Sequence, residues 1–239
     1  MKFLNNAELE RSSVVANCAM NRERKISGPN SYTKELHFNP LPFLKQRLQN
    51  QSRVAWLDLC CGSGRALIEV AQDLCDSGLA DCVRLVGIDL VPMFWEHPCC
   101  LHNLELRSEA LSQWDCKSEY DLITCVHGLH YIGNKLRTIE EAAVGLTADG
   151  VFLAHLDLNN IKFADGTLAR QHVIATLKDN DFTYNPRKHL LCLRGKQLMQ
   201  FPYRYLGSDD EAGPNYTGQP AVDSYYDYSQ LPTRTKGAQ

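Results

Sequence analysis

The sequence predicts an α/β fold, a doubly wound seven-stranded and mostly parallel sheet that ends in an antiparallel C-terminal hairpin, with an N-terminal helical cap. From residue 53 onward, short β-branched or apolar runs alternate with longer amphipathic runs, which is the order of β-α-β units. The central runs are apolar on both faces, as expected when helices cover both sides of a parallel sheet. These two observations define the fold class.

The alternation divides the chain into three parts. Residues 1–50 contain no strand pattern and form the helical cap, residues 51–206 form a Rossmann-like domain, and residues 207–239 form a C-terminal extension rich in Tyr, Gly and Pro. No internal repeat interrupts this order. We therefore expect one main domain with an addition at each end.

The elements of the main domain follow from the hydrophobic pattern and from turn residues. Strands are expected at 53–60, 83–90, 103–107, 120–126 and 150–158, and helices at 64–78, 135–146 and 165–178. Residues 189–206 are expected to form the closing hairpin around an Arg-Gly-Lys turn.

The two ends have weaker patterns. In the cap, helices are expected at 8–20 and 40–50, with a turn at 27–32 between them. The extension is expected to be a loop that packs through Tyr216, Tyr225 and Tyr226 and frays after Leu231.

The composition is that of a globular protein. Of the 239 residues, 44% are hydrophobic and 22% are charged, which excludes a disordered, collagenous or coiled-coil chain. The formal net charge of −3 lacks the basic excess of a protein that binds phosphate backbones. We therefore expect no nucleic-acid partner.

Neither export nor membrane insertion is expected. The apolar stretch after Lys2 ends at Asn5, which is too short for the core of a signal peptide. Asp58, Asp89 and Asp121 interrupt the most hydrophobic segments, so no window reaches the roughly 18 apolar residues of a membrane span. A soluble, cytoplasmic protein is the expectation.

The ten cysteines are expected to be reduced and packed in the core, because they lie in strand-like runs of a chain without an export signal. The tandem pairs Cys60-Cys61 and Cys99-Cys100 lack the C-x-x-C spacing with which two thiolates chelate one zinc ion. No metal site is predicted.

A glycine loop joins the first strand to the first helix of the main domain. Gly62 and Gly64 allow a ligand to approach the backbone there, where doubly wound folds bind nucleotide cofactors. A dinucleotide site would require a small residue at position 67, which is Leu67, and Asp58 would repel a diphosphate. S-adenosylmethionine carries an ammonium and a sulfonium but no phosphate, so the charge of Asp58 favours it.

These residues resemble the first motif of the class I S-adenosylmethionine-dependent methyltransferases, an acidic residue two positions before three alternating glycines. Asp58, Gly62 and Gly64 match the motif, and Cys60 replaces its first glycine. The resemblance covers about residues 50–206. It implies a methyltransferase fold and S-adenosylmethionine as the cofactor.

The resemblance also implies further cofactor contacts. Asp89 ends the second strand, where one carboxylate can accept hydrogen bonds from both ribose hydroxyls. Glu109 occupies the place from which the family presents an acid to the adenine amino group. Their neighbours Leu90 and Ala110, together with Val126 after the fourth strand, are expected to lie beside the cofactor.

The catalytic candidates follow the fourth strand. His127, His130 and Tyr131 lie at the carboxyl edge of the sheet, where open α/β folds bind ligands. If the acceptor is a hydroxyl, one of the two histidines removes its proton, and His127 is favoured because it is closer to the strand end. Each histidine could equally be a packed or capping residue.

The acceptor site is expected between the sheet and the cap. His155 on the fifth strand, and Arg24 and Tyr32 in the cap, are the candidate substrate-binding residues. A basic, aromatic lid suits an acceptor with a carboxylate or a phenol, whereas a solvated helix face is the alternative.

The sequence therefore predicts methyl transfer to a small organic or peptide-like acceptor, with oxygen as the expected methylated atom. An Asn-Pro-Pro-Tyr motif for exocyclic amines is missing, and Asp115, Asp121 and Asp157 show no common geometry for a catechol-type metal site. The alternatives are an RNA or protein methyltransferase and a non-catalytic cofactor-binding scaffold. The oligomeric state stays open.

Overall fold

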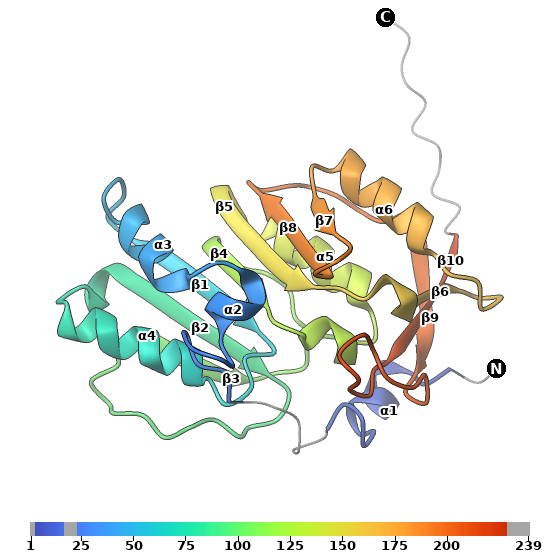
Figure 1. Cartoon of the computed structure of the whole chain (residues 1–239), viewed down its shortest axis with the longest axis horizontal. Coiled ribbons are helices and arrows are strands. Elements are labelled where there is room, and N and C mark those ends of the chain that lie inside the picture. The colour runs from blue at the N-terminus through green and yellow to red at the C-terminus, as the bar shows by residue number, and fades with distance from the viewer. Residues whose placement is uncertain (1–2, 17–22, 229–239) are drawn as a thin grey trace, which may run out of the picture.

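The larger of two β-sheets forms the centre of the protein, whose computed structural model describes residues 3–16 and 23–228 (Figure 1). Its seven strands have the order β3-β2-β1-β4-β5-β8-β7. They are β1 (Val54–Leu59), β2 (Val83–Asp89), β3 (Leu104–Ser108), β4 (Tyr120–Cys125), β5 (Leu146–His155), β7 (Thr183–Asn185) and β8 (Leu190–Arg194). Neighbouring strands from β3 to β5 are parallel, and β8 is antiparallel to β5 and β7. The predicted fold class is confirmed.

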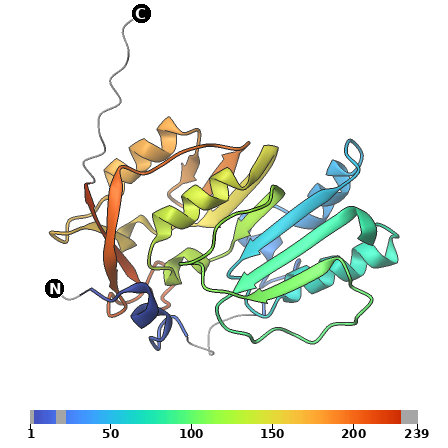
Figure 2. The ribbon, with the colours of Figure 1, turned by 180° about the vertical axis from the view of Figure 1, so that it is seen from behind.

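Helices cover both faces of this sheet, as Figures 1 and 2 show from opposite sides. One face packs on α3 (Pro40–Arg47) and α4 (Arg65–Asp76), and the other on α5 (Lys135–Val144) and α6 (Arg170–Asp179). Side chains of β1 alternate accordingly, since Trp56 packs toward α4 while Leu57 packs toward α5. Short 3-10 helices lie at η1 (Ala80–Cys82), η2 (Gly128–Tyr131) and η3 (Leu158–Asn160).

The amphipathic pattern explains why α4 forms directly after the glycine loop. Leu67, Val70, Ala71 and Leu74 follow the i, i+3, i+4, i+7 spacing and are fully buried against the sheet. The helix begins after Gly64, which has a left-handed φ of +73°. Its first turn therefore points at the carboxyl ends of β1 and β2.

The cap contains shorter helices than the sequence pattern predicts. The helix expected at 8–20 is α1 (Asn6–Glu10), followed by turns to residue 16, and residues 17–20 lie outside the described part of the chain. The turn expected at 27–32 leads into α2 (Tyr32–Leu36), whose N-cap Ser31 accepts a hydrogen bond from Lys34 N at 3.2 Å. The helix expected at 40–50 is confirmed as α3.

The closing hairpin of the main sheet is formed by a different pair of strands from the pair that the sequence predicts. The predicted strand after His189 exists as β8, but its hairpin partner is β7, which precedes it in the chain. The chain leaves the sheet after β8 at Gly195, which has a left-handed φ of +81°. The signal for β7 was weak because this strand has three residues and a largely exposed surface.

A second sheet replaces the expected C-terminal loop. Its order is β6-β10-β9, with β6 at Ile161–Phe163, β9 at Tyr203–Asp209 and β10 at Asp223–Tyr228. The N-terminal segment lies beside it, because Leu4 pairs with Ser208 (Figure 1). The expected fraying after Leu231 falls outside the described residues.

Buried polar contacts explain why β10 was not recognised as a strand. Asp223 and Ser224 would be expected on a surface, but Asp223 accepts a hydrogen bond from Asn160 at 2.8 Å and pairs with Lys162. Ser224 accepts a hydrogen bond from the buried Lys135 Nζ of α5 at 2.8 Å. The extension is thereby attached to the main domain.

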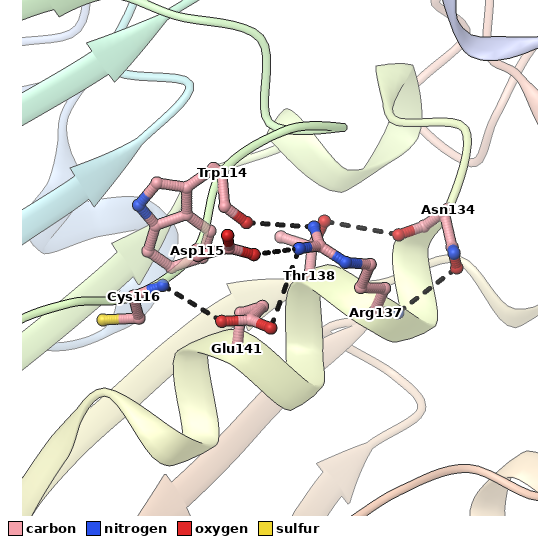
Figure 3. A network of polar contacts seen from close by, with 7 residues as sticks. All are labelled: Trp114, Asp115, Cys116, Asn134, Arg137, Thr138 and Glu141. Atoms are coloured by element: carbon pink, nitrogen blue, oxygen red, sulfur yellow. Dashed lines mark hydrogen bonds and ion pairs between the residues drawn. The ribbon is translucent and has the colours of Figure 1, made fainter.

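The connection between β3 and β4 is held by one arginine of α5 (Figure 3). Arg137 donates to the carbonyl oxygen of Trp114 at 2.9 Å and pairs with Asp115. Glu141, one turn further along α5, accepts a hydrogen bond from Cys116 N at 3.0 Å. The start of this connection, from Glu109, lines the cavity described below.

No helix among residues 3–16 and 23–228 is long and apolar enough to cross a membrane.

Replacing Arg137 with methionine is expected to lower the stability of the protein by about 1–2 kcal/mol, because a carbonyl loses its charged donor. For a chain of this size that corresponds to a fall in melting temperature of roughly 2–8 °C. The matched control is Arg204→Met, whose ion pair with Asp227 is exposed; equal effects of the two substitutions would contradict the assigned role.

Candidate functional site

A cavity of about 750 Å³ lies at the carboxyl edge of the main sheet. Its walls come from the cap, from the segments that follow β1 to β5, and from the extension. The predicted site residues that line it are Arg24, Tyr32, Cys60, Gly62, Asp89, Leu90, Glu109, Ala110, Val126, His127, Tyr131 and His155. Asp58, Gly64 and His130 do not line it.

The loop after β1 has the backbone that its glycines predict. Gly62 and Gly64 have φ values of +62° and +73°, and a Cβ atom on Gly64 would lie 2.8 Å from the Leu106 side chain. Cys60 also has a left-handed φ, of +57°. A side chain at Gly128 would place its Cβ 2.4 Å from that of Cys60, so Gly128 provides the space for the thiol that replaces the motif glycine.

Asp89 joins the glycine loop to the end of β2. Its Oδ2 accepts a hydrogen bond from Gly62 N at 2.9 Å, and its Oδ1 accepts one from Val91 N at 3.0 Å. Each carboxylate oxygen can accept a second bond, and Asp89 lines the cavity. Asp89 therefore holds the glycine loop in place and presents its carboxylate at the cavity.

Asp58 is buried behind the cavity wall. It accepts a hydrogen bond of 2.5 Å from the Tyr32 hydroxyl and another of 2.5 Å from Thr124, which itself accepts from Trp56 Nε1 at 2.8 Å. Burial raises the pKa of Asp58 to about 7, although these two bonds act in the opposite direction. Asp58 thus fastens Tyr32, and with it α2 of the cap, to the sheet.

His127 lines the cavity between the cap and the extension. Its Nε2 lies 3.0 Å from Glu35 Oε2 on α2, and its Nδ1 lies 3.3 Å from the Tyr216 hydroxyl of the extension. The bond from His127 lowers the pKa of Glu35 to about 2. Glu35 is therefore ionised at neutral pH, which favours a proton on His127 Nε2 and leaves Nδ1 as the acceptor.

The other histidines lie close by. The His155 ring is stacked on that of His127 with centroids 4.1 Å apart and planes 5° apart, and burial lowers the pKa of His155 to about 3. His130 is only 1% exposed, and burial lowers its pKa well below the ordinary value. Since His130 does not reach the cavity, its geometry supports a packing role.

Two residues of this site were not assigned to it from the sequence. Glu35 is 92 positions from His127, and the sequence pattern predicts no helix at the five residues that carry it, which begin where the turn expected at 27–32 ends. Tyr216 was expected only to pack, yet it reaches His127 and stacks on His189 with centroids 3.8 Å apart. The only signal in the sequence for these two residues is their location in the segments that precede and follow the main domain.

The main sheet has seven strands and is mostly parallel, with one antiparallel strand, and the glycine loop is followed by an acid at the end of β2. These are the features of the class I methyltransferase fold. A family model described as a methyltransferase domain matches residues 30–199. The chain belongs to this family.

Solved structures with a similar fold include the CurJ carbon methyltransferase, with 12% identity, a TM-score of 0.46 and coverage of 65% of this chain and 53% of that chain. Coclaurine N-methyltransferase bound to N-methylheliamine and SAH has 18% identity, a TM-score of 0.40 and coverage of 64% and 45%. The plantazolicin methyltransferase in complex with SAH has 15% identity, a TM-score of 0.38 and coverage of 66% and 52%. The matches span about half the length of those chains, and the likeness concerns the fold alone. No curated protein matches the sequence.

The cavity fits S-adenosylmethionine by its shape and charge. The left-handed backbone at Gly62 opens the loop to a ligand, and the carboxylates of Asp89 and Glu109 line the cavity where hydroxyl and amino groups can donate to them.

Replacing Asp89 with asparagine is expected to weaken the binding of S-adenosylhomocysteine by about 1–3 kcal/mol, because a charge-assisted acceptor of two hydroxyls is lost. Isothermal titration calorimetry measures this change. Glu105→Gln, an exposed position on neighbouring β3, is the matched control and should leave the affinity unchanged. Unchanged affinity in Asp89→Asn would exclude its contact with the ribose.

The stability of the ligand-free protein is expected to depend on pH through Asp58. The folded protein keeps the Asp58 proton up to a pKa of about 7, whereas the unfolded chain loses it near 3.8. Wild-type stability should therefore fall between these two pH values, and Asp58→Asn should lack this fall. The melting temperature of the variant minus that of the wild type should increase from pH 5 to pH 7.5; a constant difference would contradict the raised pKa.

Proposed function

We propose that the protein methylates an oxygen atom of a small organic or peptide-like acceptor. The observation that carries the proposal is the position of His127, which lines the cavity between Glu35 and Tyr216. A hydroxyl acceptor needs a base near the methyl donor, and a carboxylate that orients an imidazole is a common arrangement for that purpose.

The donor half of the cavity would hold the cofactor through residues that follow β1, β2 and β3. Asp89 would accept hydrogen bonds from the ribose, and Glu109 would accept one from the adenine amino group, with Leu90, Ala110 and Val126 as apolar neighbours. When bound, S-adenosylmethionine supplies the electrophilic methyl group. Cys60 and Gly62 line the cavity between these residues and the acceptor side.

The acceptor half would take up the proton. His127 Nδ1 accepts the hydroxyl proton once the Tyr216 hydroxyl has turned away from it, and Glu35 stabilises the resulting imidazolium. The freed electron pair on the acceptor oxygen forms the new bond to the methyl carbon, and the pair of the broken carbon–sulfur bond stays on sulfur. Tyr131, which also lines the cavity, would contact the acceptor.

The acceptor class follows from the size and charge of the site. A cavity of about 750 Å³ holds both a nucleoside cofactor and a small molecule or a peptide end. Arg24 from the cap and Arg187 and Lys188 from the β7–β8 connection line it beside the aromatic Tyr32 and Tyr216. These groups suit an acceptor with a carboxylate or a phenol.

The acceptor can be found by incubating the protein with methyl-labelled S-adenosylmethionine and fractionated metabolites, and by identifying the labelled product. Label in an ether or ester supports the proposal, whereas label on nitrogen, carbon or RNA contradicts it. S-adenosylhomocysteine binding without label in any fraction would favour the non-catalytic scaffold.

With the acceptor in hand, His127→Gln is expected to lower turnover by about 10²–10⁴-fold, because glutamine cannot act as a base. Its affinity for S-adenosylhomocysteine should stay close to that of the wild type. His97→Gln, at an exposed position between β2 and β3, serves as the control. Wild-type turnover in His127→Gln would show that methyl transfer proceeds without this base.

A further inference from the structure

Three metal-ligating side chains meet on the acceptor side of the cavity. One ligand atom each of Glu35, His127 and His155 lies within 4.8 Å of the others, the only such group of histidine, cysteine and acidic side chains in the described chain. They come from α2 of the cap, from the segment after β4 and from the end of β5. All three line the cavity, so an ion held by them would be accessible to a substrate.

One candidate donor atom lacks a hydrogen-bond partner and two others lie close together, although ligation through His127 Nε2 requires its proton to move to Nδ1. His155 is 3% exposed, and its Nδ1 is buried without a hydrogen-bond partner among the described residues. An unpaired buried nitrogen costs free energy unless a ligand satisfies it. Glu35 Oε2 and His127 Nε2 lie 3.0 Å apart, which is the separation of two adjacent ligands at about 2.1 Å from one ion.

A supporting contact is present on the far side of the His127 ring. Its other nitrogen, Nδ1, lies 3.3 Å from the Tyr216 hydroxyl. Histidine ligands generally use their second nitrogen for such a bond, which fixes the orientation of the ring. The parallel stack of His127 and His155 must open for both nitrogens to point at one centre, and the cavity beside them provides the space.

We propose that Glu35, His127 and His155 bind one divalent transition-metal ion, with its remaining coordination positions open to the cavity. Two imidazoles and one carboxylate suit Zn²⁺, Mn²⁺, Fe²⁺ and Co²⁺ better than Mg²⁺ or Ca²⁺, which prefer oxygen ligands. The inference goes beyond the cysteine and aspartate patterns of the sequence, neither of which predicts a metal site.

The role of the ion rests on the proposed function. An acceptor hydroxyl bound to the ion would release its proton to solvent water, because the positive ion stabilises the oxygen anion, and His127 would then be a ligand instead of the base. In the metal-free protein, the same His127 and Glu35 form the hydrogen-bonded pair described above. Metal binding itself can be measured without an acceptor, so the two proposals can fail separately.

The test uses the full chain after treatment with a chelator. Calorimetric titration with ZnCl₂ and with MnCl₂ is expected to show one ion per chain, and CoCl₂ is expected to give a visible absorption band typical of a nitrogen- and oxygen-ligated ion. His155→Ala and Glu35→Gln should each weaken Zn²⁺ binding by at least about tenfold. His189→Ala, a neighbouring histidine outside the group, should bind like the wild type.

The affinity of each variant for S-adenosylhomocysteine is measured in parallel, which shows whether it still folds and binds the cofactor. Absence of saturable binding of all three ions, or equal Zn²⁺ affinity in wild type, His155→Ala and Glu35→Gln, would overturn the proposal. Either result would leave Glu35 and His127 as a hydrogen-bonded pair only.

Discussion

The buried carboxylate of Asp58 is the interaction on which the rest of the site depends. It lies near the end of β1 and receives hydrogen bonds from β4, through Thr124, and from the cap, through Tyr32. A buried acid is costly unless it is protonated or paired, so both partners are held firmly. Tyr32 begins α2, and Glu35 lies one turn later on that helix. The same bond that satisfies Asp58 therefore places Glu35 opposite His127.

The parallel sheet supplies the second constraint. Parallel neighbours bring their carboxyl ends to one edge, so the segments after β1, β2, β4 and β5 meet there although they are up to about a hundred positions apart in the chain. Asp89 can bond to Gly62 N for this reason. His127 and His155 stack for the same reason, since β4 and β5 are neighbours in register.

The part of the cavity wall that follows β1 and β2 could be predicted from the sequence because its signals are local. Gly62 and Asp89 stand at fixed distances from two strands that the hydrophobic pattern identifies, whereas Asp58 lies behind the wall. The acceptor half of the proposed site could not be predicted, because its geometry depends on contacts between segments that are far apart in the sequence. Glu35 belongs to a five-residue helix without an amphipathic period, and Tyr216 follows a strand, β9, that the pattern assigned to the wrong sheet. The sequence does not predict the strand β10 for a related reason. Its polar residues are buried only because Lys135, Asn160 and Lys162 bind them.

The two parts of the cavity wall differ in how closely their residues are packed. The donor half is built from strands of the central sheet, whose side chains are almost all buried and closely packed. The acceptor half is lined by the cap and the extension, which also pack on the core through buried side chains such as Leu36 and Tyr226. Partly exposed lining residues such as Arg24, Glu35 and Tyr216 can be substituted at less cost to the core than these buried residues, and such substitutions change the size and charge of the cavity. We therefore expect substitutions at Arg24, Glu35 and Tyr216 to change the proposed acceptor site more than substitutions in the glycine loop.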